Sequence, residues 1–228
     1  MKVSIIIPAY EAHGEGVMFL TELLDSINSQ TYRNIEIIIS DHSKNKDIED
    51  FCKKTYDHVI HFYNERGRGN SSVNMNEGIK KASGDIIKIM HLDDIFCNNE
   101  AVQRIVDAVG DRTVKWGAFA FNHNHVSESV VKNEIKPKMY YNGVMDAESL
   151  IGCPSVSFFA NDDNFFDENM IIINDFDMHY RLREKYGPPF MIKEVSITVR
   201  IHAGQVTNAL ETYKEKEKEE MEYFKIKK

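Results

Sequence analysis

The sequence is poor in cysteine, in positive charge and in long apolar runs, and each shortage excludes a class of protein. Its three cysteines stand far apart with no C-x-x-C pair, which favours free thiols in a reducing compartment over disulfides or a zinc site. No apolar run reaches the length of a membrane span. The first residues pass directly into a strand pattern without the layout of a signal peptide. We therefore expect a soluble, cytoplasmic protein.

Lysine and arginine number 28 against 36 aspartates and glutamates, so the formal net charge is -8 at pH 7. A general nucleic-acid surface is not expected from such a chain. An anionic substrate is still compatible with it, because a bound metal ion can supply local positive charge. With 228 residues and 42% hydrophobic content, the chain can bury a sizeable core without disulfides or metal ions.

Residues 1–95 alternate short apolar runs with helical patterns. The β-branched runs at 3–7, 35–39, 59–63 and 85–92 predict buried parallel strands, and apolar spacing predicts helices at 17–29, 47–54 and 73–82. A polar loop follows each of the four strands. These loops should converge on one edge of the sheet, which is where open α/β sheets bind ligands.

The second half of the chain has a less regular pattern. It predicts helices at 98–109, 146–150, 175–186 and 211–222, and strands at 115–126, 155–160 and 190–201. Residues 130–135 are expected to pair with 115–126 as a hairpin, and residues 225–228 to fray as a tail. No internal repeat, long linker or composition break divides the chain, so one domain is the simplest interpretation.

Two adjacent carboxylates, Asp93 and Asp94, follow the apolar run at 85–92. Like charges at this spacing repel each other unless a cation or hydrogen-bond donors lie between them. Mg²⁺ and Mn²⁺ prefer oxygen ligands and usually take one or two carboxylates together with substrate phosphates. The pair is therefore a candidate metal site. The alternative is a turn aspartate followed by a helix cap.

Four other positions are less specific. Asp41 ends the second predicted strand and could bind a base or ribose, although a turn aspartate is the simpler interpretation. Asp175 opens a helix, where a carboxylate could act as a general base or only as a cap. His202 ends the last strand and could bind a metal, or could be an ordinary core or surface histidine. Asn76 follows a glycine- and arginine-rich loop that is neither G-x-G-x-x-G nor a P-loop.

In their order along the chain, these features resemble the family 2 glycosyltransferases, which are inverting nucleotide-sugar enzymes of the GT-A fold. The resemblance rests on SIIIPAYE at 4–11, IIISDHS at 37–43, NEGI at 76–79, ASGD at 82–85, HLDD at 91–94, ND at 174–175 and RIH at 200–202. It covers nearly the whole chain. It implies an α/β, Rossmann-like single domain with a central mixed, mostly parallel sheet flanked by helices.

The resemblance also implies roles. Asp175 would be the base that deprotonates the acceptor hydroxyl. A divalent metal, Mn²⁺ or Mg²⁺, would be held by Asp93, Asp94 and His202 and would act as a Lewis acid on the departing nucleoside diphosphate. The residues that would contact the nucleotide are Pro8, Tyr10, Glu11, Asp41, Asn76, His91 and Asp93.

The implied partners are a nucleotide-diphosphate sugar, expected to be a UDP-sugar, and a hydroxyl acceptor in glycan or polysaccharide synthesis. Residues 1–95 would form the nucleotide-binding half, 96–205 the acceptor and catalytic half, and 206–228 a C-terminal helix and tail. Acceptor contacts are expected between residues 122 and 167. Neither a nucleic-acid partner nor a transmembrane segment is expected, so a lipid-linked acceptor would require peripheral docking at a membrane.

The chain departs from the family pattern at four motif positions. His91 stands where aspartate is common, Asn174 where glutamate is usual, Met75 where arginine is common, and His42 where a second acid is frequent. These departures leave two alternatives open. One is a sugar nucleotidyltransferase, although the loop at 9–14 lacks the glycine-rich, basic character of that class. The other is a non-catalytic nucleotide- or glycan-binding relative.

Overall fold

Strands and helices alternate along the first half of the chain, as the sequence predicts. The computed structural model describes residues 1–56, 58–110, 113–125, 132–135, 151–205 and 210–227. The first four strands pair in parallel, in the order β3-β2-β1-β4. They are β1 (Val3–Ala9), β2 (Ile35–Asp41), β3 (Ile60–Tyr63) and β4 (Ile86–Ile89), connected by α1 (Gly16–Asn28), α2 (Asp47–Thr55) and α3 (Ser71–Lys81). Their C-terminal ends therefore share one edge of the sheet.

The second half extends this sheet mainly by antiparallel pairing. Strand β8 (Ser157–Ala160) runs antiparallel to β4 and to β6 (Trp116–His125). Strand β9 (Phe190–Ile201) pairs in parallel with β6, and β7 (Lys132–Ile135) forms the predicted hairpin with β6. Among the described residues, the sheet has nine strands in the order β3-β2-β1-β4-β8-β6-β9-β5, with β7 on β6.

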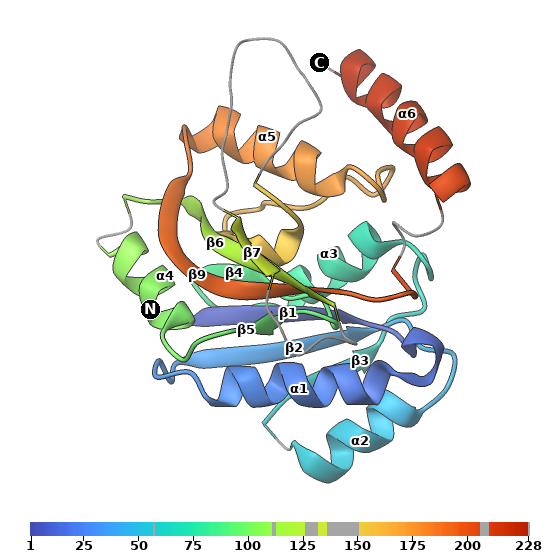
Figure 1. Cartoon of the computed structure of the whole chain (residues 1–228), viewed down its shortest axis with the longest axis vertical. Helices are drawn as coiled ribbons and strands as arrows, with labels where there is room; N and C mark the ends of the chain where they lie inside the picture. Colours follow the sequence, from blue (N-terminus) through green and yellow to red (C-terminus); the bar gives the residue numbers. More distant parts are fainter. Residues whose placement is uncertain (57, 111–112, 126–131, 136–150, 206–209, 228) are drawn as a thin grey trace.

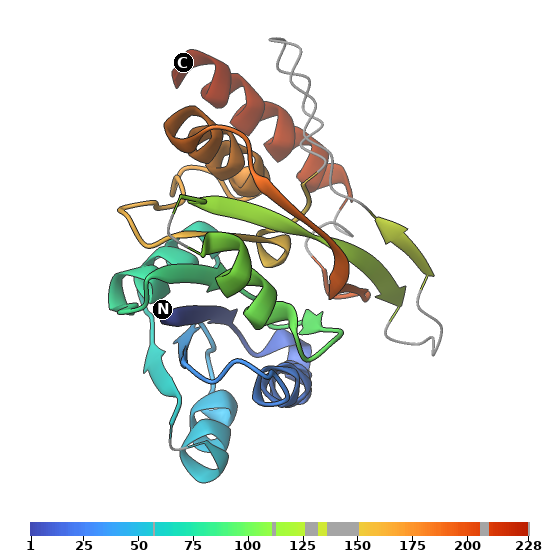
Figure 2. The same ribbon diagram turned by 90° about the vertical axis from the view of Figure 1, so that its left-hand side faces the viewer.

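Helices cover the sheet on both sides. In Figure 1, α1 and α2 lie below the strands, whereas α5 (Asn174–Tyr186) and α6 (Leu210–Lys227) lie above them. Figure 2 shows α6 running alongside α5. The predicted α/β domain with a mixed sheet flanked by helices is thus confirmed. None of the helices that the structure describes is both long and apolar enough to cross a membrane.

Three details of the predicted elements need correction or lie beyond the structure. The short strand β5 (Ile95–Phe96), which pairs with β9, was not predicted. The expected fraying at 225–228 is wrong for residues 225–227, because α6 continues to Lys227, whose Nζ lies 2.6 Å from Asp167 and 2.9 Å from Asp177. The helix predicted at 146–150 lies outside the described residues.

A glycine in α3 allows this helix to lie close against the sheet. A Cβ atom at Gly78 would lie 2.3 Å from Cγ2 of Ile6 in β1, so any other residue would require Ile6 or the helix to shift. Ile6 is fully buried, as are most residues of β1 and β4. This close approach packs the C-terminal half of α3 against β1.

A partly buried carboxylate joins the start of β1, the start of β2 and the turn before β4. Glu36 accepts hydrogen bonds from Lys2 Nζ at 2.6 Å, Ser4 Oγ at 2.6 Å, and both the backbone N–H and the hydroxyl of Ser83 at 2.9 and 2.7 Å. Burial opposes ionisation of Glu36, but the hydrogen bonds outweigh it and lower the pKa to about 2.

We expect Glu36→Gln to destabilise the protein by roughly 2–3 kcal/mol at neutral pH, because a depressed folded-state pKa means that the ionised form contributes stability. That contribution is complete above the unfolded-state pKa and is lost as pH falls through about 2. Urea unfolding from pH 7 to pH 3 should show the gap between wild type and variant closing as the pH falls. The exposed Glu65→Gln is the control and should behave as wild type; a pH-independent gap would contradict the assignment.

Candidate functional site

The turn after β1 carries predicted site residues on a strained backbone. Ala12 and His13 have φ values of 45° and 55°, a left-handed region that residues other than glycine seldom adopt. Glu11 accepts a hydrogen bond from the backbone N–H of Lys44 at 3.1 Å, which ties this turn to the loop after β2. Tyr10 is 38% exposed, and its partial burial, together with the nearby charge of Asp93, raises its pKa. The turn therefore faces Asp93.

Asp41 ends β2, but its carboxylate points into the protein. It is fully buried, with Oδ2 2.9 Å from His61 Nε2 and Oδ1 accepting the Ser43 N–H at 2.8 Å. Burial works against ionisation, yet these hydrogen bonds outweigh it and lower the pKa of Asp41. Pro8 lies in register beside Ser40 at the same edge. Because both oxygens of Asp41 already have partners, its contact with a nucleotide stays a prediction.

A cavity of about 480 Å³ opens at the ends of β2 and β3. The Glu11–Lys44 hydrogen bond places it beside the turn after β1. Its polar walls carry charges of both signs. The lining residues are Ser43, Lys44, Lys46, Glu49, Tyr63, Glu65 and Arg68.

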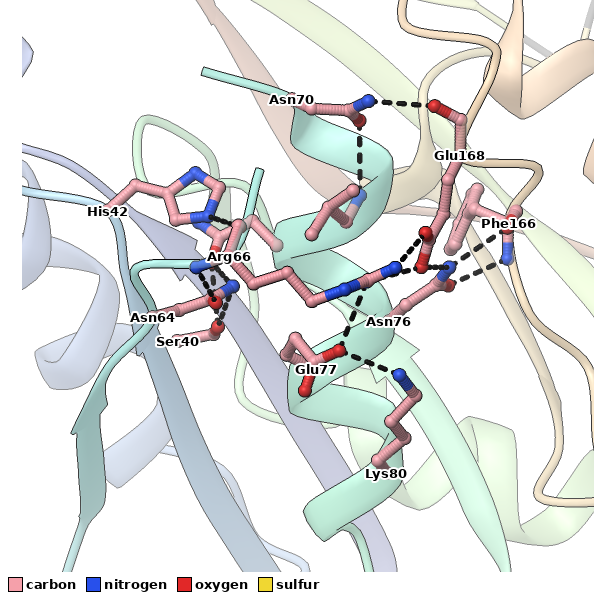
Figure 3. Close-up of polar contacts among 12 residues, drawn as sticks. Ser40, His42, Asn64, Arg66, Asn70, Asn76, Glu77, Lys80, Phe166 and Glu168 are labelled. Carbon is pink, nitrogen blue, oxygen red and sulfur yellow. Dashed lines mark hydrogen bonds and ion pairs between the residues drawn. The ribbon is translucent and has the colours of Figure 1, made fainter. Parts of the chain in front are cut away.

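Asn76 lies in α3 and is engaged in a structural contact. Its side chain exchanges two hydrogen bonds with the backbone of Phe166, at 2.8 and 2.9 Å, and also donates to Glu168 at 3.2 Å. Figure 3 shows Glu168 paired in turn with both terminal nitrogens of Arg66, which also reaches Glu77. This network fastens the segment after β8 to α3. The nucleotide contact predicted for Asn76 likewise stays a prediction.

Asp93 meets His202, although 109 positions separate them. Asp93 Oδ2 lies 2.9 Å from His202 Nε2, and this hydrogen bond raises the pKa of the histidine. Arg200 reinforces the contact by donating from Nε to the Asp93 carbonyl and from Nη1 to Glu22. A partly exposed carboxylate and an imidazole therefore face each other at the sheet edge, and their binding of a metal stays a prediction.

Asp94 points the other way, into the protein. It is only 2% exposed, and its oxygens accept the backbone N–H of Arg200 at 3.2 Å and the thiol of Cys153 at 3.7 Å. Burial, with the charge of Asp93 adding to it, raises the pKa of Asp94 to about 8. Ligand atoms of His91, Asp94 and Cys153 lie within 4.8 Å of one another, so these three residues form a second donor set.

Asp175 lies in the first turn of α5 and is partly buried. Burial raises its pKa to about 6, although hydrogen bonds from the backbone N–H groups of Phe176 and Asp175 oppose the shift. The charge of Glu220 in α6 raises it further. A carboxylate with such a pKa can accept a proton near neutral pH, which an ordinary aspartate does poorly.

Cys153 contacts Asp94 and interacts electrostatically with Asp175 and Asp93. Burial raises the pKa of its thiol well above the usual value, and the charges of Asp94, Asp175 and Asp93 add to the shift. Charge effects on a pKa weaken with distance, so all three carboxylates lie near this sulfur. The structure therefore brings Asp175 to the same region as Asp93, Asp94 and His202.

Sequence reasoning gave no role to Arg200 or Cys153. Arg200 had a usable signal, because residues two apart in a strand share a face and His202 stands two positions on. Both residues do reach the Asp93 turn, from the end of β9. Cys153 had none: it meets Asp94 across 59 positions, a contact that only the pairing of β8 with β4 creates.

Comparison with protein-family models gives one match that covers most of the chain. The model described as Glycosyl transferase family 2 matches residues 4–175. An uncharacterised glycosyltransferase of Rickettsia typhi is 31% identical over 220 residues, which is 90% of this chain and 66% of the relative. The chain thus spans about two thirds of the length of this relative.

The solved structures with the same fold include two proteins with bound nucleotide sugars. Staphylococcus aureus TarS, residues 1–349 in complex with UDP-GlcNAc, has a TM-score of 0.68 at 15% identity, covering 94% of this chain and 64% of that one. A mannosyltransferase from Pyrobaculum calidifontis, in complex with GDP-Man and Mn²⁺, has a TM-score of 0.61 at 17% identity, covering 88% and 56%. At these identities the likeness concerns the fold.

Proposed function

The chain belongs to glycosyl transferase family 2, and from this we propose that it moves a sugar from a nucleotide-diphosphate sugar to an acceptor hydroxyl, with inversion at the anomeric carbon. One observation carries the proposal. The Asp93–His202 pair and the carboxylate of Asp175 are two separate groups in the region of Cys153, whose thiol donates to Asp94 and whose pKa is raised by the charges of Asp175 and Asp93. Inversion needs two such groups, because the acceptor attacks from the face opposite the leaving diphosphate.

The donor set at Asp93 and His202 fits a divalent metal that also binds a diphosphate. A carboxylate oxygen and an imidazole nitrogen already face each other at 2.9 Å, and Asp93 is partly exposed toward the sheet edge. Mn²⁺ accepts this mixture of oxygen and nitrogen ligands, and substrate phosphates commonly complete its shell. Bound there, the metal would stabilise the negative charge that develops on the departing diphosphate.

Asp94 takes a supporting role in this proposal. Its oxygens are committed to Arg200 and Cys153, so it fixes the turn that aims Asp93 outward. His91, whose pKa burial lowers, stays neutral beside it and adds no charge. Asp93 and His202 are therefore the metal ligands that we favour, with Asp94 behind them.

On the acceptor side, Asp175 takes the proton of the attacking hydroxyl. Its pKa of about 6 leaves it ionised and basic at neutral pH. Its partial burial limits the solvent that would otherwise compete for the same proton. The Asn174 side chain donates to Ser71 and Ser72 at 3.1 and 2.9 Å, so the turn that presents Asp175 is anchored to α3.

The nucleoside would lie across the turn after β1 and the loop after β2. Tyr10 is exposed beside Asp93 and offers a ring for stacking, and the cavity at the ends of β2 and β3 adjoins Glu11. Asp41 would act through the Ser43 turn that it holds. Because neighbours of the same fold were solved with UDP-GlcNAc and with GDP-Man and Mn²⁺, a UDP-sugar with Mn²⁺ is the first donor to test.

In this proposal, residues 1–95 bind the nucleotide, 96–205 supply the base and the acceptor contacts, and α6 supports the base. The acceptor is a hydroxyl compound in glycan or polysaccharide synthesis. Much of the segment expected to contact it, at 126–131 and 136–150, lies outside the described residues.

A thermal-shift screen of nucleotide sugars, each with and without Mn²⁺, tests the donor class. A ligand present at a hundred times its Kd adds about 2.7 kcal/mol to native-state stability, so the correct donor should raise Tm clearly. We expect the largest shift from a UDP-sugar with Mn²⁺. Equal shifts with EDTA and with Mn²⁺ would contradict the metal role.

We expect Asp93→Asn to weaken Mn²⁺-dependent UDP binding by at least about tenfold, since even outer-shell changes at metal sites cost that much. Calorimetric titration of UDP at fixed Mn²⁺ gives the measurement. Cys153→Ser is the matched control and should bind as wild type. If the donor set of His91, Asp94 and Cys153 holds the metal instead, the two variants will exchange behaviour and our assignment fails.

We expect Asp175→Asn to lower kcat by roughly 10²- to 10⁴-fold, the usual contribution of a general base, while UDP binding is unchanged. In the wild type the base must be ionised, so activity should fall as pH drops below about 6 and the carboxylate takes up a proton. UDP release with a working acceptor, followed from pH 5 to 8, measures both. A variant that retains full turnover would remove Asp175 from the mechanism.

A further inference from the structure

The C-terminal helix packs directly on the helix that carries Asp175. Phe224 of α6 is 1% exposed, and its ring makes edge contacts with Phe176 and Tyr180 of α5, at centroid distances of 5.1 and 5.4 Å. Met170 and Ile173 complete a small apolar cluster around it, separate from the main core. Figure 2 shows the two helices side by side. Helix α6 thus has one buried stripe on an otherwise charged surface.

A buried glutamate of α6 accepts hydrogen bonds from the turn that precedes α5. The Glu220 carboxylate accepts three successive backbone N–H groups, those of Ile171, Ile172 and Ile173, at 2.8, 2.9 and 3.0 Å. Glu220 is 2% exposed. Unpaired N–H groups at a helix start need acceptors, and an anion there is favoured by the helix dipole. A carboxylate from 47 or more positions away supplies that anion here.

A second contact between α6 and α5 lies at the C-terminal end of α6. Lys227 Nζ bonds Asp167 at 2.6 Å and Asp177 at 2.9 Å, and Asp177 is a fully buried residue in the first turns of α5. Helix α6 therefore holds α5 at two places, on either side of the Phe224 contact.

Three titratable groups from neighbouring elements face Asp175: Glu220 and Tyr213 of α6, and Cys153 before β8. The pKa of Tyr213 and that of Cys153 are raised, mainly by burial, so both are neutral at physiological pH. Glu220 is the one facing group, among those the structure describes, that brings a charge to the base.

We propose that Glu220 is a positioning residue for the base. Its carboxylate, bound to the three N–H groups before α5, fixes where Asp175 lies and places a negative charge near it. This inference rests on the proposed role of Asp175. It gives α6 an indirect role in catalysis, through the position of Asp175, although no residue of α6 need touch a substrate. The physical reason is that a buried anion one turn before a carboxylate both orders its backbone and disfavours its ionisation.

The test compares pH profiles of kcat for wild type, Glu220→Gln and Glu220→Asp, in the full chain with a working donor and acceptor. Glu220→Gln removes the charge and replaces one of the two acceptor oxygens with an NH2 group, which cannot accept from a backbone N–H. We expect kcat to fall by about tenfold or more from misplacement of the base, and the acid limb to move to lower pH. Glu220→Asp keeps the charge, so its acid limb should stay near that of wild type even if kcat falls.

Glu222→Gln is the matched control, because Glu222 lies on the exposed face of the same helix and the charge change is identical. It should leave both kcat and the profile unchanged. UDP binding with Mn²⁺ reports the folded nucleotide site and should be equal in all variants. A Glu220→Gln enzyme that binds UDP normally and keeps the wild-type acid limb overturns the inference.

Failure of the inference can be told apart from failure of the proposed function. If Asp175→Asn retains turnover, the base itself is misassigned. If Asp175→Asn is inactive but the Glu220→Gln profile does not move, the base stands and only the role of α6 falls. Should Glu220→Gln fail to fold, Phe224→Leu, which loosens the same packing while leaving every charge, must lower kcat without moving the acid limb; a moved limb would contradict the charge argument.

Discussion

The site depends on the different environments of two adjacent carboxylates, Asp93 and Asp94. Asp94 turns inward, where the Arg200 N–H and the Cys153 thiol occupy its oxygens and burial raises its pKa to about 8. Asp93 turns outward and meets His202. Because burial favours the protonated form of Asp94, it reduces the repulsion expected between two adjacent carboxylates. Asp93 then remains as a single, partly exposed carboxylate at the strand end, and Asp94 behind it holds the turn in place.

Much of this arrangement was predictable because it follows from local patterns. The β-branched runs gave β1 to β4, parallel strands brought their loops to one edge, and the position of Asp93 after β4 followed. What was not predictable depends on long-range packing. Arg200 reaches the Asp93 carbonyl across 107 positions, and β5 exists only because β9 lies beside it. The fraying expected after residue 224 was wrong for a similar reason: Lys227 finds its acid partners only in the folded protein.

Some motif residues stabilise the fold, and the sequence pattern alone does not distinguish them from residues that bind a ligand. Asn76 and Gly78 belong to one motif, yet the asparagine fastens the Phe166 backbone and the glycine makes room for Ile6. Asp41 likewise holds its own turn through Ser43 and faces His61. Each of these residues positions a loop at the sheet edge. Their contribution to binding would therefore be indirect, through the shape of that edge.

The departures from the family pattern can be related to which residues of the site carry a negative charge. Neutral side chains stand at His91 and Asn174, where acids are common, and Asp94 is held close to neutrality by burial. The charge that remains lies on Asp93, at the proposed metal, and on Asp175 and Glu220, at the proposed base. One carboxylate and one imidazole are a sparse shell for a divalent cation, which needs further oxygen ligands. The diphosphate of the donor would supply them, so in this protein the metal and the donor would be held together rather than one after the other.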